Sequence, residues 1–194
     1  MAVVTARTSH PPAELDEVTL VRAQRGDDAA CRALVDRYQR PVFALLGRMV
    51  GHGRRPLVED LAQETFLRAF KALAGFERSG PAKLSSWLLT IATRLAIDEL
   101  RRAELPRAPI EAADTVGVAP RGEAEAERHL LGARLAAALA TLPVDQRAVV
   151  LLSDVHELSL EEIGRALAVE LGTVKSRLSR ARARLRDALE EVHG

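Results

Sequence analysis

The sequence is poor in aromatic residues and has almost no cysteine. Aromatic side chains make up 3% of the 194 residues, and Cys31 is the single cysteine. Strand-forming residues are scattered, whereas Ala, Leu and Arg are plentiful, which favours an all-helical protein. One cysteine cannot form an internal disulfide or a cysteine-cluster metal site, so we expect a reducing, intracellular setting.

The chain also lacks a long hydrophobic run. No apolar stretch approaches the roughly 18–20 residues that span a bilayer. The first residues, MAVVTARTSHPPAELDE, contain no hydrophobic signal core. These absences predict a soluble, cytoplasmic protein without membrane insertion.

Neither sign of charge dominates, since 28 Lys and Arg face 27 Asp and Glu for a net charge of +1. The signs are nevertheless segregated along the chain. Residues 103–128 are mainly acidic, whereas residues 170–186 carry six cations against Glu170 alone. Such asymmetry is typical of a nucleic-acid-binding protein, so the balanced total does not exclude one.

No catalytic or metal-binding motif is present. The sequence has no H-E-x-x-H, no G-x-S-x-G and no glycine-rich phosphate loop, and its histidines are scattered. We therefore expect no catalytic residue, no metal and no cofactor, and an enzyme is the disfavoured class. His156, just before a capping motif, is interpreted as a turn residue. Cys31 lies in an apolar helical stripe and is interpreted as a core residue rather than a redox sensor.

Helical periodicity divides the chain into two units. Residues 1–14 predict a disordered tail, residues 15–102 a first helical unit and residues 129–194 a second one. Residues 103–128 lack periodicity and contain several prolines and glycines, which predicts a flexible acidic linker. The expected fold is all-α: two small helical domains joined by a flexible linker, the C-terminal one a helix-turn-helix.

The first unit contains signals for individual helices. After a short first helix, Asp28 is expected to cap a longer one, which Pro41 should kink or divide. A third helix is expected over residues 56–73, and a fourth should start at Ser85 or Ser86.

The strongest local pattern covers residues 159–185. Ser159 and Glu162 have the spacing of a capping box, and a tight turn at residues 168–170 should separate that short helix from a longer basic one. The expected buried stripe of the second helix is Leu171, Val174, Leu178, Ala181 and Leu185. This is a helix-turn-helix arrangement, whose second helix can lie in the DNA major groove. The alternative is that the cations only form a solvated face on a packing helix.

Two further segments have a functional and a plain interpretation. Residues 58–70 predict an amphipathic helix with an acidic side, which would repel phosphate and so suits a protein partner, although a solvated face is the alternative. Trp87 follows the polar loop 76–85 and precedes several cations, a combination that could stack bases and hold single-stranded backbone. Taken alone, Trp87 would be a core residue.

Together these segments resemble the extracytoplasmic-function (ECF) sigma factors, the small two-domain members of the bacterial sigma-70 family. Residues 60–69 resemble the polymerase-binding helix of region two, and residues 86–102 resemble its promoter-melting and minus-ten segment. Residues 142–147 and 172–182 resemble region four. The family more often has Phe where Leu84 stands here.

The resemblance implies a sigma factor that binds core RNA polymerase and promoter DNA, serves a stress or envelope response, and is controlled by an anti-sigma factor. The implied polymerase-binding residues are Asp60, Gln63, Glu64 and Phe66. The implied minus-ten residues, including the loop that would hold a flipped base, are Ser79, Lys83, Ser85, Trp87, Thr90, Thr93, Arg94, Asp98 and Arg101. The implied minus-thirty-five residues are Glu170, Thr173, Lys175, Ser176, Arg177, Ser179 and Arg180.

A helix-turn-helix repressor or activator that binds operators without polymerase is the alternative from another class. It would explain the basic helix but neither the acidic side of residues 58–70 nor the Trp87 segment. The two readings differ in whether the protein binds duplex DNA strongly by itself.

Overall fold

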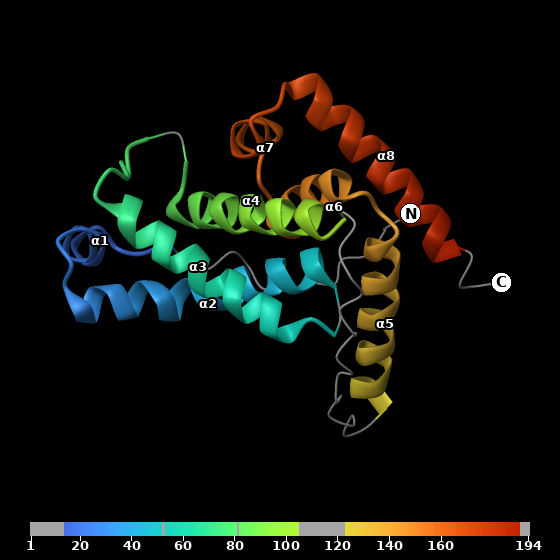
Figure 1. Ribbon diagram of the computed structural model, residues 1–194, viewed down its shortest axis with the longest axis horizontal. Coiled ribbons are helices and arrows are strands. Elements are labelled where there is room, and N and C mark those ends of the chain that lie inside the picture. Colours follow the sequence, from blue (N-terminus) through green and yellow to red (C-terminus); the bar gives the residue numbers. More distant parts are fainter. Residues whose placement is uncertain (1–13, 52, 81, 105–122, 191–194) are drawn as a thin grey trace.

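The computed structural model describes residues 14–51, 53–80, 82–104 and 123–190, and these residues form helices without a strand (Figure 1). The all-α prediction is confirmed. The helices are α1 (Glu17–Gln24), α2 (Asp28–Val50), α3 (Arg55–Leu73), α4 (Leu84–Glu104), α5 (Glu123–Ala140), α6 (Val144–Val150), α7 (Leu160–Leu167) and α8 (Leu171–Glu190), with a π-helical segment, Leu151–Val155, continuing α6. Most of the predicted tail and linker lies outside the described residues.

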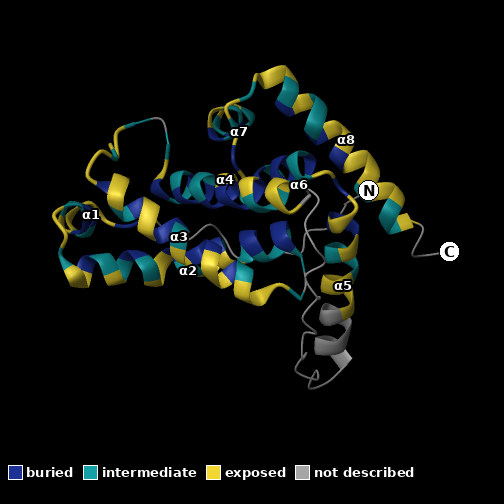
Figure 2. Cartoon of the chain, in the orientation of Figure 1, coloured by how far each residue is buried: buried dark blue, intermediate teal, exposed yellow. Residues whose placement is uncertain are grey.

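The first unit, α1–α4, is built around α2. Helix α2 packs against α1, α3 and α4, and its buried apolar residues recur at helical spacing along one side. Tyr38, Leu45, Leu46 and Met49 from this side are almost completely buried, as Figure 2 shows for the inward faces of the bundle. Burial of these side chains supplies the main favourable term that holds the helices together.

The predicted N-cap of α2 is wrong, and of the two effects predicted for Pro41, a kink or a division of the helix, the division is excluded. The N-cap is Asp27, whose Oδ1 accepts a hydrogen bond from the Ala30 N–H at 2.9 Å, because Asp27 has extended backbone and Asp28 is already helical. Pro41 does not divide the helix, which runs unbroken to Val50. Residues on both sides of the proline, Tyr38 and Val42, are buried, and their packing outweighs the one lost backbone hydrogen bond.

The second unit, α5–α8, contains the predicted helix-turn-helix. Ser159 and Glu162 form the capping box, and Ala168, with φ 54° and ψ 46°, ends α7 in the left-handed conformation that turns the chain into α8. Val174, Leu178 and Ala181 are buried as predicted.

Leu171 does not belong to the buried stripe of α8. Leu171 is 38% exposed, and the buried positions of α8 begin one turn later, at Val174. The segment before this unit is also shorter than the predicted linker, since α4 continues to Glu104 and α5 already begins at Glu123.

The two units are in direct contact. Helix α4 packs against α6 and α7, and α2 packs against α5 and α6. Figure 1 shows α7 lying over α4, with α8 extending away from it. Buried residues of the two units belong to one continuous hydrophobic cluster. This contact decides which of the predicted DNA-facing side chains are accessible.

Candidate nucleic-acid interface

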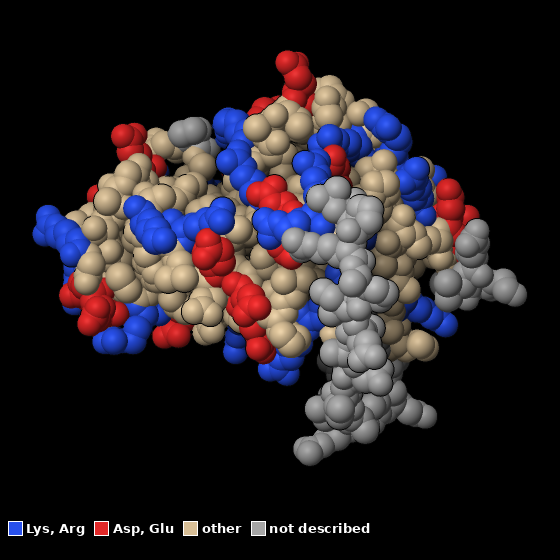
Figure 3. Space-filling model, viewed as in Figure 1, with Lys and Arg blue, Asp and Glu red and all other residues tan. Residues whose placement is uncertain are grey.

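The predicted minus-thirty-five residues lie at the turn before α8 and along this helix, and they differ in exposure. Glu170, Lys175, Ser179 and Arg180 are exposed, and Thr173, Ser176 and Arg177 are half-buried. Cationic side chains follow α8 on the face seen in Figure 3. A helix of this kind can place donors against base edges and phosphates in a major groove.

The Arg180 guanidinium is held along α8. Its Nε donates to the Ser176 carbonyl oxygen at 3.2 Å, and its Nη2 donates to the Ser176 Oγ at 3.1 Å. Both acceptors are uncharged oxygens of Ser176, so these contacts leave the charge of Arg180 available to an anionic ligand. A guanidinium fixed in this way loses less conformational entropy on binding.

Arg177, in contrast, is paired with an acid. Its Nη2 lies 3.0 Å from Oδ2 of Asp145, in the first turn of α6. The other oxygen of the same carboxylate, Oδ1, lies 2.7 Å from Nη2 of Arg101 in α4. Asp145 therefore joins a predicted minus-thirty-five residue to a predicted minus-ten residue. Sequence reasoning missed Asp145, because nothing local in the sequence indicates partners on two other helices.

Two other predicted residues of α4 differ in their contacts. Asp98 and Arg94 are both exposed, and Arg94 donates from Nε to the Ala166 carbonyl oxygen at 2.6 Å and from Nη2 to the Arg165 carbonyl oxygen at 3.2 Å. Arg94 thus reaches the C-terminal end of α7, where a cation is favourable because the last carbonyl groups of a helix lack partners.

The predicted role of Thr93 needs correction. Thr93 is completely buried, and its hydroxyl donates to the Leu89 carbonyl oxygen at 2.7 Å, so the side chain cannot contact DNA in this conformation. Thr90 is half-buried and makes the equivalent bond to the Ser86 carbonyl oxygen at 2.8 Å. Both hydroxyls therefore use their donor on a backbone carbonyl oxygen of their own helix.

The loop before α4 keeps Ser79 and Lys83 exposed. Trp87 is half-buried and packs against the core, and its ring centroid lies 5.2 Å from that of Phe76 at an interplanar angle of 44°. The pair holds the loop against the helix. Trp87 thus makes the core contacts expected of a core residue and remains partly exposed.

Glu14 caps α4 from a distant part of the chain. Its carboxylate accepts hydrogen bonds from the Leu84 N–H at 3.2 Å, from the Ser85 N–H at 3.4 Å and from the Ser85 hydroxyl. Glu14 was assigned to the disordered tail, yet it fixes the residue where the loop enters α4. No sequence signal could have found this cap, because the two partners lie 70 and 71 positions away.

The acidic side of α3 is partly available to a protein partner. Asp60 and Gln63 are exposed, whereas Glu64 forms an ion pair with Arg68 at 2.6 Å. Phe66 is only 8% exposed and belongs to the core, so the prediction that it contacts polymerase needs correction. Leu67, four residues after Gln63, is the 46% exposed apolar residue of this face, and its helical spacing could have revealed it.

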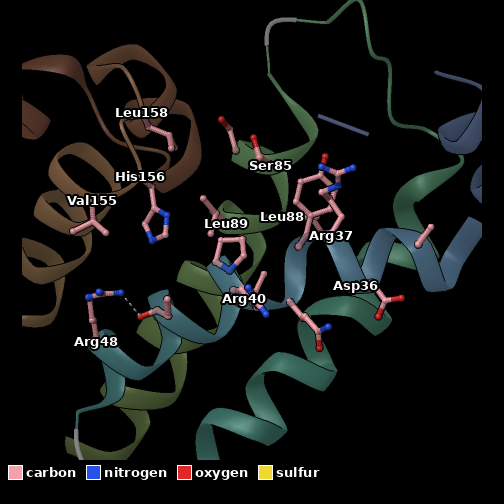
Figure 4. A pocket seen from close by; sticks show the side chains of 17 residues that line it. Asp36, Arg37, Arg40, Arg48, Ser85, Leu88, Leu89, Val155, His156 and Leu158 are labelled. Carbon is pink, nitrogen blue, oxygen red and sulfur yellow. Dashed lines mark hydrogen bonds between the residues drawn. The ribbon is translucent and has the colours of Figure 1, made fainter. Parts of the chain in front are cut away.

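A cleft of about 860 Å³ lies between the two units, lined by α2, the start of α4 and residues 155–158 (Figure 4). His156 lies in the turn, as predicted, but its Nε2 is buried with no hydrogen-bond partner among the described residues. Burial, and secondarily the charge of Arg48, lowers the pKa of His156 to about 4. Arg48 donates to the Ala44 carbonyl oxygen at 3.1 Å, and burial lowers its own pKa. The neutral imidazole is the form that suits this site.

Cys31 packs against the core, and burial raises the pKa of its thiol above the ordinary value. A raised pKa leaves little thiolate at neutral pH, which fits a core role. Within the described ranges no cluster of three or more His, Cys, Asp or Glu residues could hold a metal ion. Among the described helices, none combines the length and apolar character needed to cross a membrane.

Two family models match the chain in order. Residues 34–105 match sigma-70 region 2, and residues 132–185 match sigma-70 region 4. The chain is 37% identical to the ECF RNA polymerase sigma factor SigE of Mycolicibacterium smegmatis over 92% of this chain and 70% of that one. It is 33% identical to the ECF RNA polymerase sigma factor SigW of Bacillus subtilis over 88% of this chain and 95% of that one.

Solved structures share the fold. CnrH, solved in complex with the cytosolic domain of CnrY, matches with a TM-score of 0.64 at 27% identity, over 91% of this chain and 97% of that one. The sigma factor RpoE of Bartonella quintana, solved with the anti-sigma factor NepR, matches with a TM-score of 0.59 at 25% identity, over 78% and 91% of the two chains.

Proposed function

The chain belongs to the ECF RNA polymerase sigma factors of the sigma-70 family, and we propose that its two helical units bind core RNA polymerase and direct it to a set of promoters. The observation that carries the proposal is the presence of region 2 and region 4, in that order, on one chain. The protein acts by binding, without catalysis of its own, in the cytoplasm where polymerase works.

The polymerase-binding surface of the proposal is the outer side of α3. Polar and anionic groups are supplied there by Asp60, Gln63 and Glu64, and Leu67 adds an exposed apolar side chain. Phe66 is buried and packs α3 against the core. A mixed surface of this kind suits a protein partner that carries complementary cations.

In this proposal, the loop before α4 and α4 itself recognise the minus-ten element. Ser79 and Lys83 on the loop are accessible to an extruded base and its backbone, and Ser85 lies where the loop enters the helix. Trp87, Thr90, Arg94, Asp98 and Arg101 follow along α4. Melting benefits from such groups because unpaired strands are held by stacking and by cations.

In this proposal, α8 recognises the minus-thirty-five element. The residues proposed to read it are Glu170, Thr173, Lys175, Ser176, Arg177, Ser179 and Arg180, of which Glu170, Lys175, Ser179 and Arg180 are exposed. Two weak DNA contacts on one chain reinforce each other when promoter spacing suits both, because the second contact then forms at a high effective concentration.

An anti-sigma factor is the second protein partner in this proposal. The fold relatives support it, since RpoE of Bartonella quintana was solved with an anti-sigma factor and CnrH with the cytosolic domain of CnrY. Such a partner would occupy the polymerase-binding and DNA-binding surfaces until a stress or envelope signal releases it.

Run-off transcription tests the proposal. Purified core polymerase and this protein are incubated with a pool of bacterial upstream DNA, and the products are sequenced. Discrete start sites preceded by two shared elements support the proposed function and supply the promoter sequence. No binding to core, together with strong binding of duplex DNA by the protein alone, would overturn it in favour of an operator-binding regulator.

A further inference from the structure

Helix α1 holds the beginning of the loop at residues 76–85. Gln24, the last residue of α1, donates from Nε2 to the Leu73 carbonyl oxygen at 3.0 Å and to the Phe76 carbonyl oxygen at 2.8 Å. Leu73 ends α3, and the last carbonyl groups of a helix have no partner within that helix. One amide group therefore ties both the end of α3 and the first residue of the loop to α1, which lies beside them in Figure 1.

The other end of the loop is held from the opposite end of the same segment. Glu14 lies just before α1, and its carboxylate accepts hydrogen bonds from the N–H groups of Leu84 and Ser85 at 3.2 and 3.4 Å. A negative charge is favourable there, because the first N–H groups of α4 point at it. The Tyr38 hydroxyl donates to the same carboxylate at 3.2 Å. Residues 14–24 thus bind the loop at both of its ends.

These two anchors matter more than the surface contact between α1 and the loop. Arg78 lies 3.8 Å from Glu17, but the two side chains are 49% and 78% exposed, and an ion pair of this kind contributes little. The anchors, in contrast, bind the backbone of Leu73 and Leu84, whose side chains are almost completely buried. The ends of the loop are therefore fixed to a packed part of the first unit.

A small pocket of about 150 Å³ lies between this segment and the loop. Leu15 and Leu20 line it from the α1 side, and Arg78 and Lys83 line it from the loop. An apolar wall opposite two cations suits a base and its phosphate. The position of the loop relative to α1 sets the shape of this pocket.

We infer that residues 14–24 form a scaffold that sets the conformation of loop 76–85 and thereby the base preference at the minus-ten element, with Gln24 and Glu14 as its positioning residues. The inference rests on the proposed function, because that function assigns the loop to an extruded base. An extruded base is read by hydrogen bonds and stacking in a close-fitting pocket, so a displaced loop changes which base fits. Polymerase binding through α3 and minus-thirty-five recognition through α8 do not depend on the scaffold.

Three variants separate the hydrogen bonds of Gln24 from its packing. Gln24→Met keeps a long unbranched side chain but has no N–H donor, so the carbonyl oxygens of Leu73 and Phe76 lose their partner on α1. Gln24→Lys restores a donor, and a cation suits the end of a helix. Thr65→Val is the matched control, because the Thr65 hydroxyl donates to the Leu61 carbonyl oxygen at 2.7 Å within α3. It removes one buried hydrogen bond from the same unit without touching the loop.

Fluorescence of the free full-length protein tests the scaffold without polymerase. Trp87 is the only tryptophan of the sequence, and its ring centroid lies 5.2 Å from that of Phe76, whose carbonyl oxygen binds Gln24. We expect acrylamide to quench Trp87 more strongly in Gln24→Met than in wild type, Gln24→Lys and Thr65→Val. Equal quenching in Gln24→Met and Thr65→Val would overturn the inference.

Transcription with core polymerase tests the base preference. A promoter found by run-off transcription is randomised in its minus-ten and minus-thirty-five elements, and the transcribed sequences are counted. For Gln24→Met we expect the preference for the favoured base at a minus-ten position to fall about threefold, a part of what a well-placed base contact supplies. The minus-thirty-five preference should stay unchanged, and Gln24→Lys should stay near wild type. An unchanged minus-ten preference in Gln24→Met, or an equal loss in Thr65→Val or Gln24→Lys, contradicts the scaffold.

The wild-type protein keeps failure of the scaffold apart from failure of the proposed function. Start sites with wild type and the same minus-ten preference in every variant reject the scaffold and leave the sigma function standing. No protein-dependent start site with wild type rejects the proposed function and the inference with it, even where Trp87 of Gln24→Met is quenched more strongly. In that case α1 holds the loop, but the loop reads no promoter base.

Discussion

The Tyr38 hydroxyl in the middle of α2 and the Glu14 carboxylate at the start of the described chain lie 3.2 Å apart. Tyr38 is 1% exposed, and its oxygen also accepts a hydrogen bond from the Leu15 N–H at 3.0 Å. Burial, with the nearby carboxylate of Glu14, raises the pKa of Tyr38 to about 12. Since Glu14 also caps α4, Tyr38 indirectly fixes the point where the loop proposed to hold a flipped base enters that helix.

Replacing Tyr38 by Phe should therefore destabilise the first unit. The change leaves the buried Leu15 N–H without a partner and removes a hydrogen bond to a charged acceptor, a loss of about 1–3 kcal/mol in the free energy of unfolding. Urea unfolding followed by circular dichroism measures it. Glu17→Gln, on an exposed side chain, is the control, and a Tyr38→Phe variant as stable as that control would contradict the prediction.

Stability should also fall on acidification through His156. In the unfolded chain the imidazole binds a proton near pH 6.5, whereas in the folded protein its pKa is about 4. Between these values the unfolded state binds more protons, so stability present above pH 6.5 is lost as the pH falls toward 4. The loss reaches at most about 3 kcal/mol.

His156→Gln should flatten this dependence, because the amide does not titrate. Thermal unfolding of wild type and variant at several pH values from 7 to 4 measures the difference. Parallel curves for the two proteins would show that His156 does not contribute to the acid sensitivity.

Charge reversal on α3 should weaken polymerase binding. Asp60 is exposed, so Asp60→Lys leaves the core untouched but places a cation where we expect an anion to meet the polymerase. We expect at least a tenfold loss of affinity for core, about 1.4 kcal/mol, because like charges across an interface repel. Glu17→Lys on α1 makes the same change in charge elsewhere, and an equal affinity of the two variants would remove Asp60 from the docking surface.

Arg180→Ala should weaken promoter recognition at the minus-thirty-five element. A lost base contact costs about 1–3 kcal/mol and relaxes selectivity at one position, whereas a lost phosphate contact weakens binding evenly across sequences. Transcription with core on promoters that vary in this element distinguishes the two. Arg184→Ala, on the same helix, is the control, and full activity of Arg180→Ala on every promoter would exclude the residue from the interface.

Local patterns predicted a large part of the fold and of the candidate site. The capping box of Ser159 and Glu162 and the apolar spacing of Val174, Leu178 and Ala181 specify the helix-turn-helix, because a cap and a helical stripe depend on residues only a few positions apart. The same holds for the cations of α8 and for the exposed acidic and amide groups of Asp60 and Gln63.

The tertiary structure decided which of these side chains are available. The family resemblance assigned Phe66 and Thr93 to binding surfaces although both are buried, because a resemblance carries a role over by position and does not tell how far burial extends. Periodicity also says nothing about which distant helix supplies a partner. The bridging carboxylate of Asp145 and the cap supplied by Glu14 depend on groups brought together from separate parts of the chain, and such contacts exist only once the units have packed.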